Sequence, residues 1–335
     1  MDSLTQIALG AAVGEAAVGR EAGGRGAAWG AALGTLPDLD ILAYPFLDSV
    51  GELAFHRGLT HSLVFAVVMA PLVGTFLARL HRAFEVPRWR WRWMVFWVIG
   101  THILLDSFTV YGTQVFWPVT DYPLAFNSLF IIDPLYTIPL AMGVVFALFL
   151  RRGSSRRAHA NQLGLLVSTL YVLWSLVAKG VAYDALNRGW AAAGLEPERT
   201  MTNATPLNTI MWMGIAQQDD SLHVGLFSLL DSAPPDSFLV IPMRSELVRP
   251  VAEERAVRRV LGFSKGWYSA FERDGALVID DYRFGRSDGW LGDSGSPIFR
   301  FVMEPGDCGD TWCSFYQARP MLGSLGAVWD RMWGQ

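Results

Sequence analysis

Three short groups of histidine, aspartate and arginine stand out in the first third of this 335-residue chain. In chain order they are Asp38 and Asp40; His56, Arg57 and His61; and His102 and Asp106. His102 and Asp106 are four residues apart, so on a helix their side chains share one face, about 6 Å apart along the axis. Ionisable side chains within apolar segments are costly to bury and therefore indicate a functional site.

Neutral imidazole and carboxylate groups are ligands for hard or borderline divalent ions. We therefore predict a metal site, with zinc as the first choice of ion and manganese, iron or magnesium as alternatives. The predicted ligands are Asp38, Asp40, His56, His61, His102 and Asp106. Six ligands exceed those of one catalytic zinc, so the site holds one or two ions, or some of the carboxylates instead orient the imidazoles.

Catalytic candidates accompany these ligands. Arg57 carries a planar fork of donors that suits phosphate or carboxylate oxygens, and we expect it to stabilise a developing oxyanion. An aspartate that is not fully engaged by metal, Asp40 in our interpretation, is the candidate general base. Glu15 lies in an apolar segment and is a further candidate ligand or base; the alternative is a simple ion pair with Arg20 or Arg25.

The amino-acid composition indicates what kind of structure surrounds these residues. Hydrophobic residues make up 52% of the chain and charged residues 17%, against about 25% charged in an ordinary soluble domain. This composition excludes intrinsic disorder, and a net charge of -4 gives no basic footprint, so we expect no nucleic-acid partner. Residues 1–183 carry 13 Lys+Arg and 11 Asp+Glu, a net of +2, and the remainder carries 14 and 20, a net of -6.

Four apolar runs within residues 1–183 each have about the 20 residues that a helix needs to cross a bilayer. They are Leu59–Leu80, Trp93–Tyr111, Leu129–Leu150 and Leu163–Tyr183. Before them, Leu4–Gly19 and Ala27–Leu36 are rich in alanine and glycine, which predicts a tight helical hairpin because small residues let helix backbones approach closely. The prediction is a polytopic α-helical membrane domain over residues 1–183.

Two short basic loops set the expected orientation. One lies between the first two spans, at residues 79–92, and the other between the last two, at residues 151–157. Cytoplasmic loops carry such an excess of arginine, so residues 40–58, residues 112–128 and everything after 184 are expected on the periplasmic side. The three groups then meet near one membrane face, as a metal site assembled from several helices requires.

Residues 184–335 are predicted to form a soluble α+β domain, expected in the periplasm. Short apolar runs bounded by turn residues predict its strands. The expected strands are Thr209–Ala216, His223–Leu230, Phe238–Met243, Ala276–Phe284 and Ile298–Met303, and the expected helix is Glu253–Leu261. Cys308 and Cys313 either form a disulfide, as an oxidising compartment would allow, or remain free thiols.

The first 180 residues resemble a family of inner-membrane metal-dependent hydrolases, which is also described as LexA-binding and inner membrane-associated. The matching segments are Met1-Asp2-Ser3-Leu4-Thr5-Gln6, Leu36-Pro37-Asp38-Leu39-Asp40, the run from His56 to Ser62, and Thr101-His102 through Asp106. The resemblance implies a polytopic membrane protein with hydrolase chemistry, without implying a known substrate. Many relatives have Thr-His where this chain has Thr5-Gln6, which implies one ligand fewer here.

The leading hypothesis is a metal-dependent hydrolase of the bacterial inner membrane, with its active site near the periplasmic face. A site at the lipid interface favours membrane lipids as partners and a lipid or lipid-linked substrate, with a phosphoester or an acyl bond cleaved. One alternative is a non-catalytic scaffold or regulatory protein stabilised by metal. A metal transporter is a further alternative, but its ligands should continue toward the cytoplasmic side.

Overall fold

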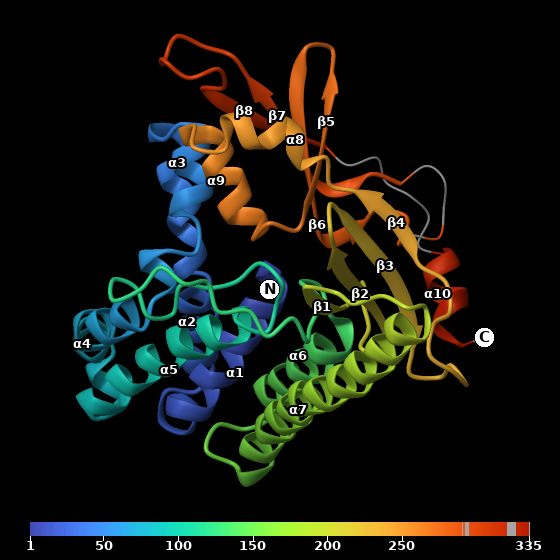
Figure 1. Ribbon diagram of the computed structural model, residues 1–335. Helices are drawn as coiled ribbons and strands as arrows, with labels where there is room; N and C mark the ends of the chain where they lie inside the picture. The colour runs from blue at the N-terminus through green and yellow to red at the C-terminus, as the bar shows by residue number, and fades with distance from the viewer. Residues whose placement is uncertain (290, 292–294, 320–325, 335) are drawn as a thin grey trace. The chain divides into compact units, whose positions relative to one another are not determined.

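The computed structural model describes residues 1–289, 291, 295–319 and 326–334, and it divides into two compact units (Figure 1). The helical unit comprises Met1–Leu42 and Phe55–Leu176, and the sheet unit comprises Ala43–Ala54 and Val177–Gln335. A helical N-terminal region is thus followed by a region of β-sheet, as the sequence predicts. The division at residue 183 itself stays a prediction.

Helices α1 (Ser3–Ala22) and α2 (Gly24–Gly34) form a hairpin that is packed through glycines. Gly10 lies against Gly30, and Gly14 lies against Gly26. A Cβ atom added at Gly30 would lie 2.0 Å from the carbonyl oxygen of Gly10, so no larger residue fits. Gly23 turns the chain between the two helices with a φ of 63°, in the region that favours glycine.

This packing makes the hairpin sensitive to a single methyl group. We expect Gly30→Ala to lower the free energy of unfolding by about 2–3 kcal/mol, because the methyl group would force α1 and α2 apart. Gly100→Ala on α5 is the matched control: no atom of the described residues lies within 4 Å of the added Cβ, and alanine is the better helix former. Chemical unfolding in detergent measures both variants, and equal midpoints would contradict the close packing.

The remaining helices of this unit begin at recognisable signals. Ser62 caps α4 by accepting a hydrogen bond from the backbone N–H of Phe65. Asp133 caps α6 in the same way, with Pro134 at the first helical position. The elements over residues 37–192 are the 3-10 helix η1 (Pro37–Phe46), α3 (Ser49–Phe55), η2 (Leu59–His61), α4 (Leu63–Leu80), η3 (Arg82–Phe84), α5 (Arg88–Asp106), α6 (Pro134–Phe149) and α7 (Ser155–Ala192). Most of α3 and the ends of η1 and α7 belong to the sheet unit. α5 is the buried centre, and its residues Trp91, Met94 and Ile99 are fully enclosed.

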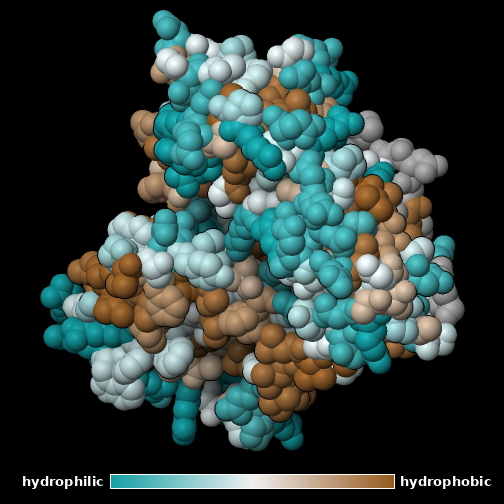
Figure 2. All heavy atoms as spheres, in the orientation of Figure 1, coloured by the Kyte–Doolittle hydropathy of each residue, from teal (hydrophilic) through white to brown (hydrophobic). Residues whose placement is uncertain are grey.

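Two helices in the described part of the chain, α4 and α7, are long and apolar enough to cross a membrane. Both helices carry exposed apolar side chains, such as Leu72 and Phe76 on α4 and Leu163 and Val177 on α7. Figure 2 shows hydrophobic residues gathered over the middle of α7. α6 is apolar but has only 16 residues, and the first turn of α5 carries arginines. Membrane crossing by α5 and α6, and with it the polytopic arrangement, stays a prediction.

The sheet unit contains two antiparallel four-stranded sheets, each with its strands in chain order. The first has β1 (Arg199–Ala204), β2 (Met211–Gln218), β3 (Ser221–Ser228) and β4 (Leu239–Pro242); the second has β5 (Tyr268–Arg273), β6 (Ala276–Arg286), β7 (Pro297–Glu304) and β8 (Ser314–Ala318). The short helices are α8 (Ser245–Val248), η4 (Arg249–Val251), α9 (Arg255–Ser264) and α10 (Gly326–Met332). The end of α7 packs on the first sheet through Leu186 and Trp190, and α9 packs on the second through Val257 and Val260.

Residues 43–54 leave the helical unit and join the sheet unit, between two of the predicted ligand groups. Val50 is buried in the core of α9 and the second sheet. Asp48 accepts hydrogen bonds from Arg255 at 2.5 and 3.2 Å, and the Ser49 hydroxyl accepts one from the backbone N–H of Phe315. The sheet unit therefore anchors the segment that connects Asp40 to His56. A disulfide joins Cys308 to Cys313 in the same unit.

Candidate metal centre

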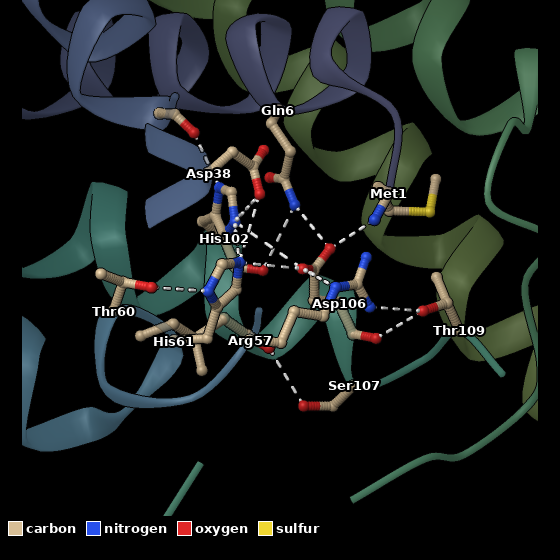
Figure 3. Close-up of polar contacts among 12 residues, drawn as sticks. Met1, Gln6, Asp38, Arg57, Thr60, His61, His102, Asp106, Ser107 and Thr109 are labelled. Atoms are coloured by element: carbon tan, nitrogen blue, oxygen red, sulfur yellow. Dashed lines mark hydrogen bonds and ion pairs between the residues drawn. The ribbon is translucent and has the colours of Figure 1, made fainter. Parts of the chain in front are cut away.

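Four side chains converge at one end of the helical unit (Figure 3). Asp38, His61, His102 and Asp106, called here the four-residue cluster, each present one ligand atom, and these atoms all lie within 4.8 Å of one another. The Nε2 atoms of the two histidines are 3.3 Å apart. Asp38 Oδ1 lies 3.2 Å from His61 Nε2 and 3.6 Å from His102 Nε2, and Asp106 Oδ2 lies 3.5 and 3.7 Å from the same two atoms.

Each member of the cluster comes from the end of an element. Asp38 lies in the first turn of η1, directly after the hairpin. His61 ends η2, immediately before α4 begins. His102 and Asp106 share one face of the last turns of α5, as their spacing predicts. Three segments that are distant in sequence thus meet at one point. The side chains of His61, His102 and Asp106 are almost completely buried, whereas Asp38 is partly exposed.

Hydrogen bonds orient both imidazoles. His102 Nδ1 lies 2.7 Å from the carbonyl oxygen of Gly34; because a carbonyl only accepts, Nδ1 carries the proton. The Thr60 hydroxyl donates to Asp40 Oδ2 at 3.5 Å, so its oxygen accepts from His61 Nδ1 at 3.1 Å. With Nδ1 of each histidine held in this way, Nε2 of each points into the cluster, and His61 Nε2 also lies within hydrogen-bond distance of Asp38 Oδ1, at 3.2 Å.

The cluster consequently brings possible metal-ligand atoms close together. Asp106 Oδ1 accepts from Gln6 Nε2 at 2.9 Å and from the amino group of Met1. Asp106 Oδ2 has no hydrogen-bond partner among the described residues, although the Arg57 Nε atom lies 3.3 Å away as an ion pair. A cation between the two carboxylate oxygens and the two imidazole nitrogens would be attracted to all four of them. Two nitrogen and two oxygen donors fit a borderline divalent ion.

Asp40 and His56, the other two predicted ligands, lie beside the cluster and outside it. Asp40 accepts hydrogen bonds from His56 Nδ1 and from the backbone N–H of Arg57, each at 3.1 Å. Burial, the largest single influence, would raise the pKa of Asp40, but the hydrogen bond and charge of His56, the backbone N–H of Arg57 and the charge of His61 together hold that pKa below its usual value. Through Thr60, the Asp40 carboxylate instead orients His61, which is the alternative that the sequence left open for some of the carboxylates.

Arg57 lies over the cluster with its side chain buried. Its Nη1 atom donates to the Thr109 hydroxyl at 3.2 Å, and its guanidinium carbon lies 4.6 Å from the centre of the Tyr111 ring. Its backbone has a φ of 60°, which is uncommon for any residue but glycine. The guanidinium is thus held next to Asp106 by contacts on several sides.

The structure does not bring Glu15 to this site. Glu15 accepts from Arg157 Nε at 2.6 Å and from Arg157 Nη2 at 2.8 Å. Its position on α1 is nine residues beyond Gln6, about 13 Å along the helix axis. The sequence predicted Arg20 or Arg25 as its alternative partner; the partner is Arg157, which lies 142 residues away in the chain.

Sequence reasoning did not assign roles to several groups around the cluster. Gln6 and Thr60 both lie inside the motifs that drew attention, at Thr5-Gln6 and between Gly58 and His61, so the motifs carried a signal for them. The carbonyl of Gly34 and the hydroxyl of Thr109 have no signal in the sequence. Their contacts with His102 and Arg57 depend on which segments pack together in the fold, and the sequence does not show this packing.

The relay from Asp40 through Thr60 to His61 leads to a test of metal affinity. We expect Asp40→Asn to weaken metal binding by about 10- to 100-fold, because outer partners of a ligating histidine contribute that much. Asp184→Asn is the matched control, since Asp184 is an exposed residue of α7 in the sheet unit that pairs with Arg188. Competition with a chelating dye measures both affinities, and equal affinities would rule out a role for Asp40 in orienting His61.

Comparison with known proteins bears on the same residues. A family described as YdjM inner membrane protein matches residues 1–182, which include the whole cluster. Inner membrane protein YbcI of Escherichia coli (strain K12) is 41% identical over 95 residues, 28% of this chain and 53% of that protein, so the chain spans about half the length of this curated relative. No solved structure matches the chain significantly. The family match covers more than half of the chain and confirms the resemblance: the chain belongs to the YdjM inner membrane protein family.

Proposed function

We propose that this inner membrane protein is a metal-dependent hydrolase that holds a divalent ion on Asp38, His61, His102 and Asp106. The observation that carries the proposal is the convergence of two imidazole nitrogens and two carboxylate oxygens within 4.8 Å. A cation between these four atoms would stabilise such a group. When bound, a divalent metal ion supplies Lewis acidity and activates water for attack at neutral pH.

The surrounding residues have the roles that hydrolysis needs. Arg57, fixed by Thr109 and Tyr111, would neutralise negative charge that develops on a substrate oxygen. Asp40 and His56 form a hydrogen-bonded pair next to the cluster, and the His56 side chain is 21% exposed. This pair can take a proton from the attacking water and pass it to solvent, with Asp40 as the base.

The surface beside the site favours a lipid or lipid-linked substrate with a phosphoester or acyl bond. Leu39, Ile41 and Leu42 follow Asp38 and are each about half exposed or more, and Leu59 and Leu63 flank His61 with similar exposure. An apolar rim around a polar cluster suits a molecule with an apolar tail and a polar head. Arginine in the loops at the opposite helix ends favours a periplasmic location for the site.

A second candidate function deserves a test because the cluster offers four protein donors. Structural zinc sites are closed by four protein ligands, whereas catalytic zinc sites keep one position open. A closed site would make the protein a metal-stabilised scaffold that presents its sheet unit to partners. A six-coordinate ion such as manganese or iron would leave positions open even with four protein ligands.

Metal analysis combined with a reaction screen distinguishes these functions. We expect the gently purified full chain to contain close to one equivalent of metal, and to hydrolyse a component of a bacterial lipid extract that Asp38→Asn leaves intact. Absence of stoichiometric metal would overturn the proposal. Metal without any open coordination position, and without hydrolysis, would favour the scaffold.

A further inference from the structure

A second polar cavity lies at the other end of the same helices, and the proposed hydrolysis does not use it. Its volume is about 420 Å³, and the end of α1, the start of α5 and the start of α7 form its walls. α1 runs from Gln6, next to the four-residue cluster, to Arg20 in the cavity wall, a rise of about 20 Å. All of the lining residues belong to the helical unit.

The charged residues that line the cavity are three arginines from three helices and one carboxylate. Arg157 of α7 donates to both oxygens of Glu15, so that carboxylate is already neutralised. Arg90 of α5 donates to Glu21 at 2.5 Å. Arg20 of α1 makes no ion pair with any residue that the structure describes. The cavity wall therefore keeps a net positive charge and one guanidinium that is available to a ligand.

Neutral donors complete the cavity next to these arginines. Ser154 and Ser155 line it at the start of α7. The Ser154 hydroxyl accepts from the backbone N–H of Arg157 at 3.3 Å, which leaves its own proton for another acceptor. Hydroxyl donors beside guanidinium groups are suited to the oxygens of a phosphate.

The cavity opens where the apolar surface of the helices ends. Gln162 lines the cavity, and the next residue, Leu163, is 61% exposed. Phe149, just before the turn that leads into α7, is 85% exposed. Side chains this apolar and this exposed belong in hydrocarbon, so the cavity lies at the level of the lipid head groups. Basic pockets between helices at that level bind anionic head groups on the cytoplasmic side.

We propose that this cavity binds the phosphate group of an anionic ligand, with Arg20 as the direct contact. A phospholipid head group and free phosphate share this chemistry, and the depth of the cavity favours the head group. Glu15 and Arg157 form the rigid wall, since their ion pair is buried and bidentate. The proposal is independent of the hydrolase function, because the cavity and the cluster share no residue.

Thermal unfolding of the full chain in dodecyl maltoside tests the proposal with three probes. The probes are dioleoylphosphatidylglycerol, zwitterionic dioleoylphosphatidylcholine, and sodium phosphate at constant ionic strength. We expect phosphatidylglycerol to raise the unfolding midpoint and phosphatidylcholine to leave it unchanged. Arg20→Glu and the milder Arg20→Gln should each raise the lipid concentration for half of this shift at least tenfold. Arg88→Glu is the matched control, because Arg88 is an exposed arginine at the start of α5 that does not line the cavity.

The outcomes separate the ligand sources from a general surface effect. An Arg20-dependent shift with phosphatidylglycerol alone identifies a lipid head group, and one that sodium phosphate also produces identifies a free phosphate site. The proposal is overturned if neither probe gives a shift that depends on Arg20, or if Arg88→Glu loses as much affinity as Arg20→Glu. Arg20→Gln keeps the test valid should charge reversal disturb the fold.

Discussion

The variant His61→Ala should retain almost no metal when it is purified alongside the unaltered chain. His61 Nε2 lies within 3.5 Å of the ligand atoms of all three other members of the four-residue cluster. Its loss removes one donor of four and also ends the relay from Asp40 through Thr60. We expect the loss of affinity to exceed the roughly 100-fold that an outer partner can contribute. Elemental analysis by inductively coupled plasma mass spectrometry measures the metal content directly.

A matched histidine variant guards against a general effect on the protein. His223→Ala removes an imidazole from β3 of the sheet unit and should leave the metal content unchanged. Any lipid hydrolysis should disappear in His61→Ala and persist in His223→Ala. If His61→Ala kept its full complement of metal while both variants unfolded at similar temperatures, His61 would not be a ligand and the proposed site would be wrong.

The residues of the cluster could be found from the sequence because charge is scarce in the apolar half of the chain. Helical periodicity places His102 and Asp106 on one face, and the structure has them at the end of α5. The basic loops predict that Asp38 and His61 lie at the same end of the helices. These rules use only the spacing of residues along the chain and the positive charge of the loops, and they need no knowledge of how the helices pack.

Which of the predicted ligands face the cluster, and which lie beside it, could not be predicted in the same way. Asp40 and His56 have the residue types and the position of ligands, yet they pair with each other, and the Asp40 carboxylate reaches His61 through Thr60. Glu15 finds its partner on α7 because α1 and α7 pack at that height. A difference of a few ångströms decides which carboxylate faces the cluster, and sequence spacing does not resolve such differences.

The strands with a clear local sequence pattern could also be predicted, whereas those that depend on distant neighbours could not. The five expected strands are present as β2, β3, β4, β6 and β7. The strands that the sequence did not reveal, β1, β5 and β8, all lie at sheet edges. An edge strand pairs on one side only, so part of its stability comes from its neighbour; of the four edge strands in the two described sheets, only β4 has an apolar run that the sequence showed. Residues 43–54 follow the same logic, because nothing local indicates that Val50 belongs to the core of the sheet unit.

Arg157→Ala is expected to destabilise the helical unit by about 3–5 kcal/mol, the cost of leaving one member of a buried ion pair without its partner. Glu15 and Arg157 are each 5% exposed, and two short hydrogen bonds join them. Without the guanidinium, the Glu15 carboxylate would remain buried among the helices with an unpaired charge. The free energy of chemical unfolding in detergent measures the effect, in the absence of added phospholipid so that a ligand of the neighbouring cavity does not contribute.

Two further variants distinguish loss of the pair from loss of a basic side chain. Arg156→Ala removes the neighbouring arginine, which is exposed, and should change the stability by less than about 0.5 kcal/mol, as surface substitutions do. The double variant Glu15→Gln with Arg157→Met replaces both charges and should recover much of the stability, because a buried pair is costly mainly when it is broken on one side. If Arg157→Ala were no worse than Arg156→Ala, the ion pair would not stabilise the helices, and the same result would remove the rigid wall on which the phosphate cavity depends.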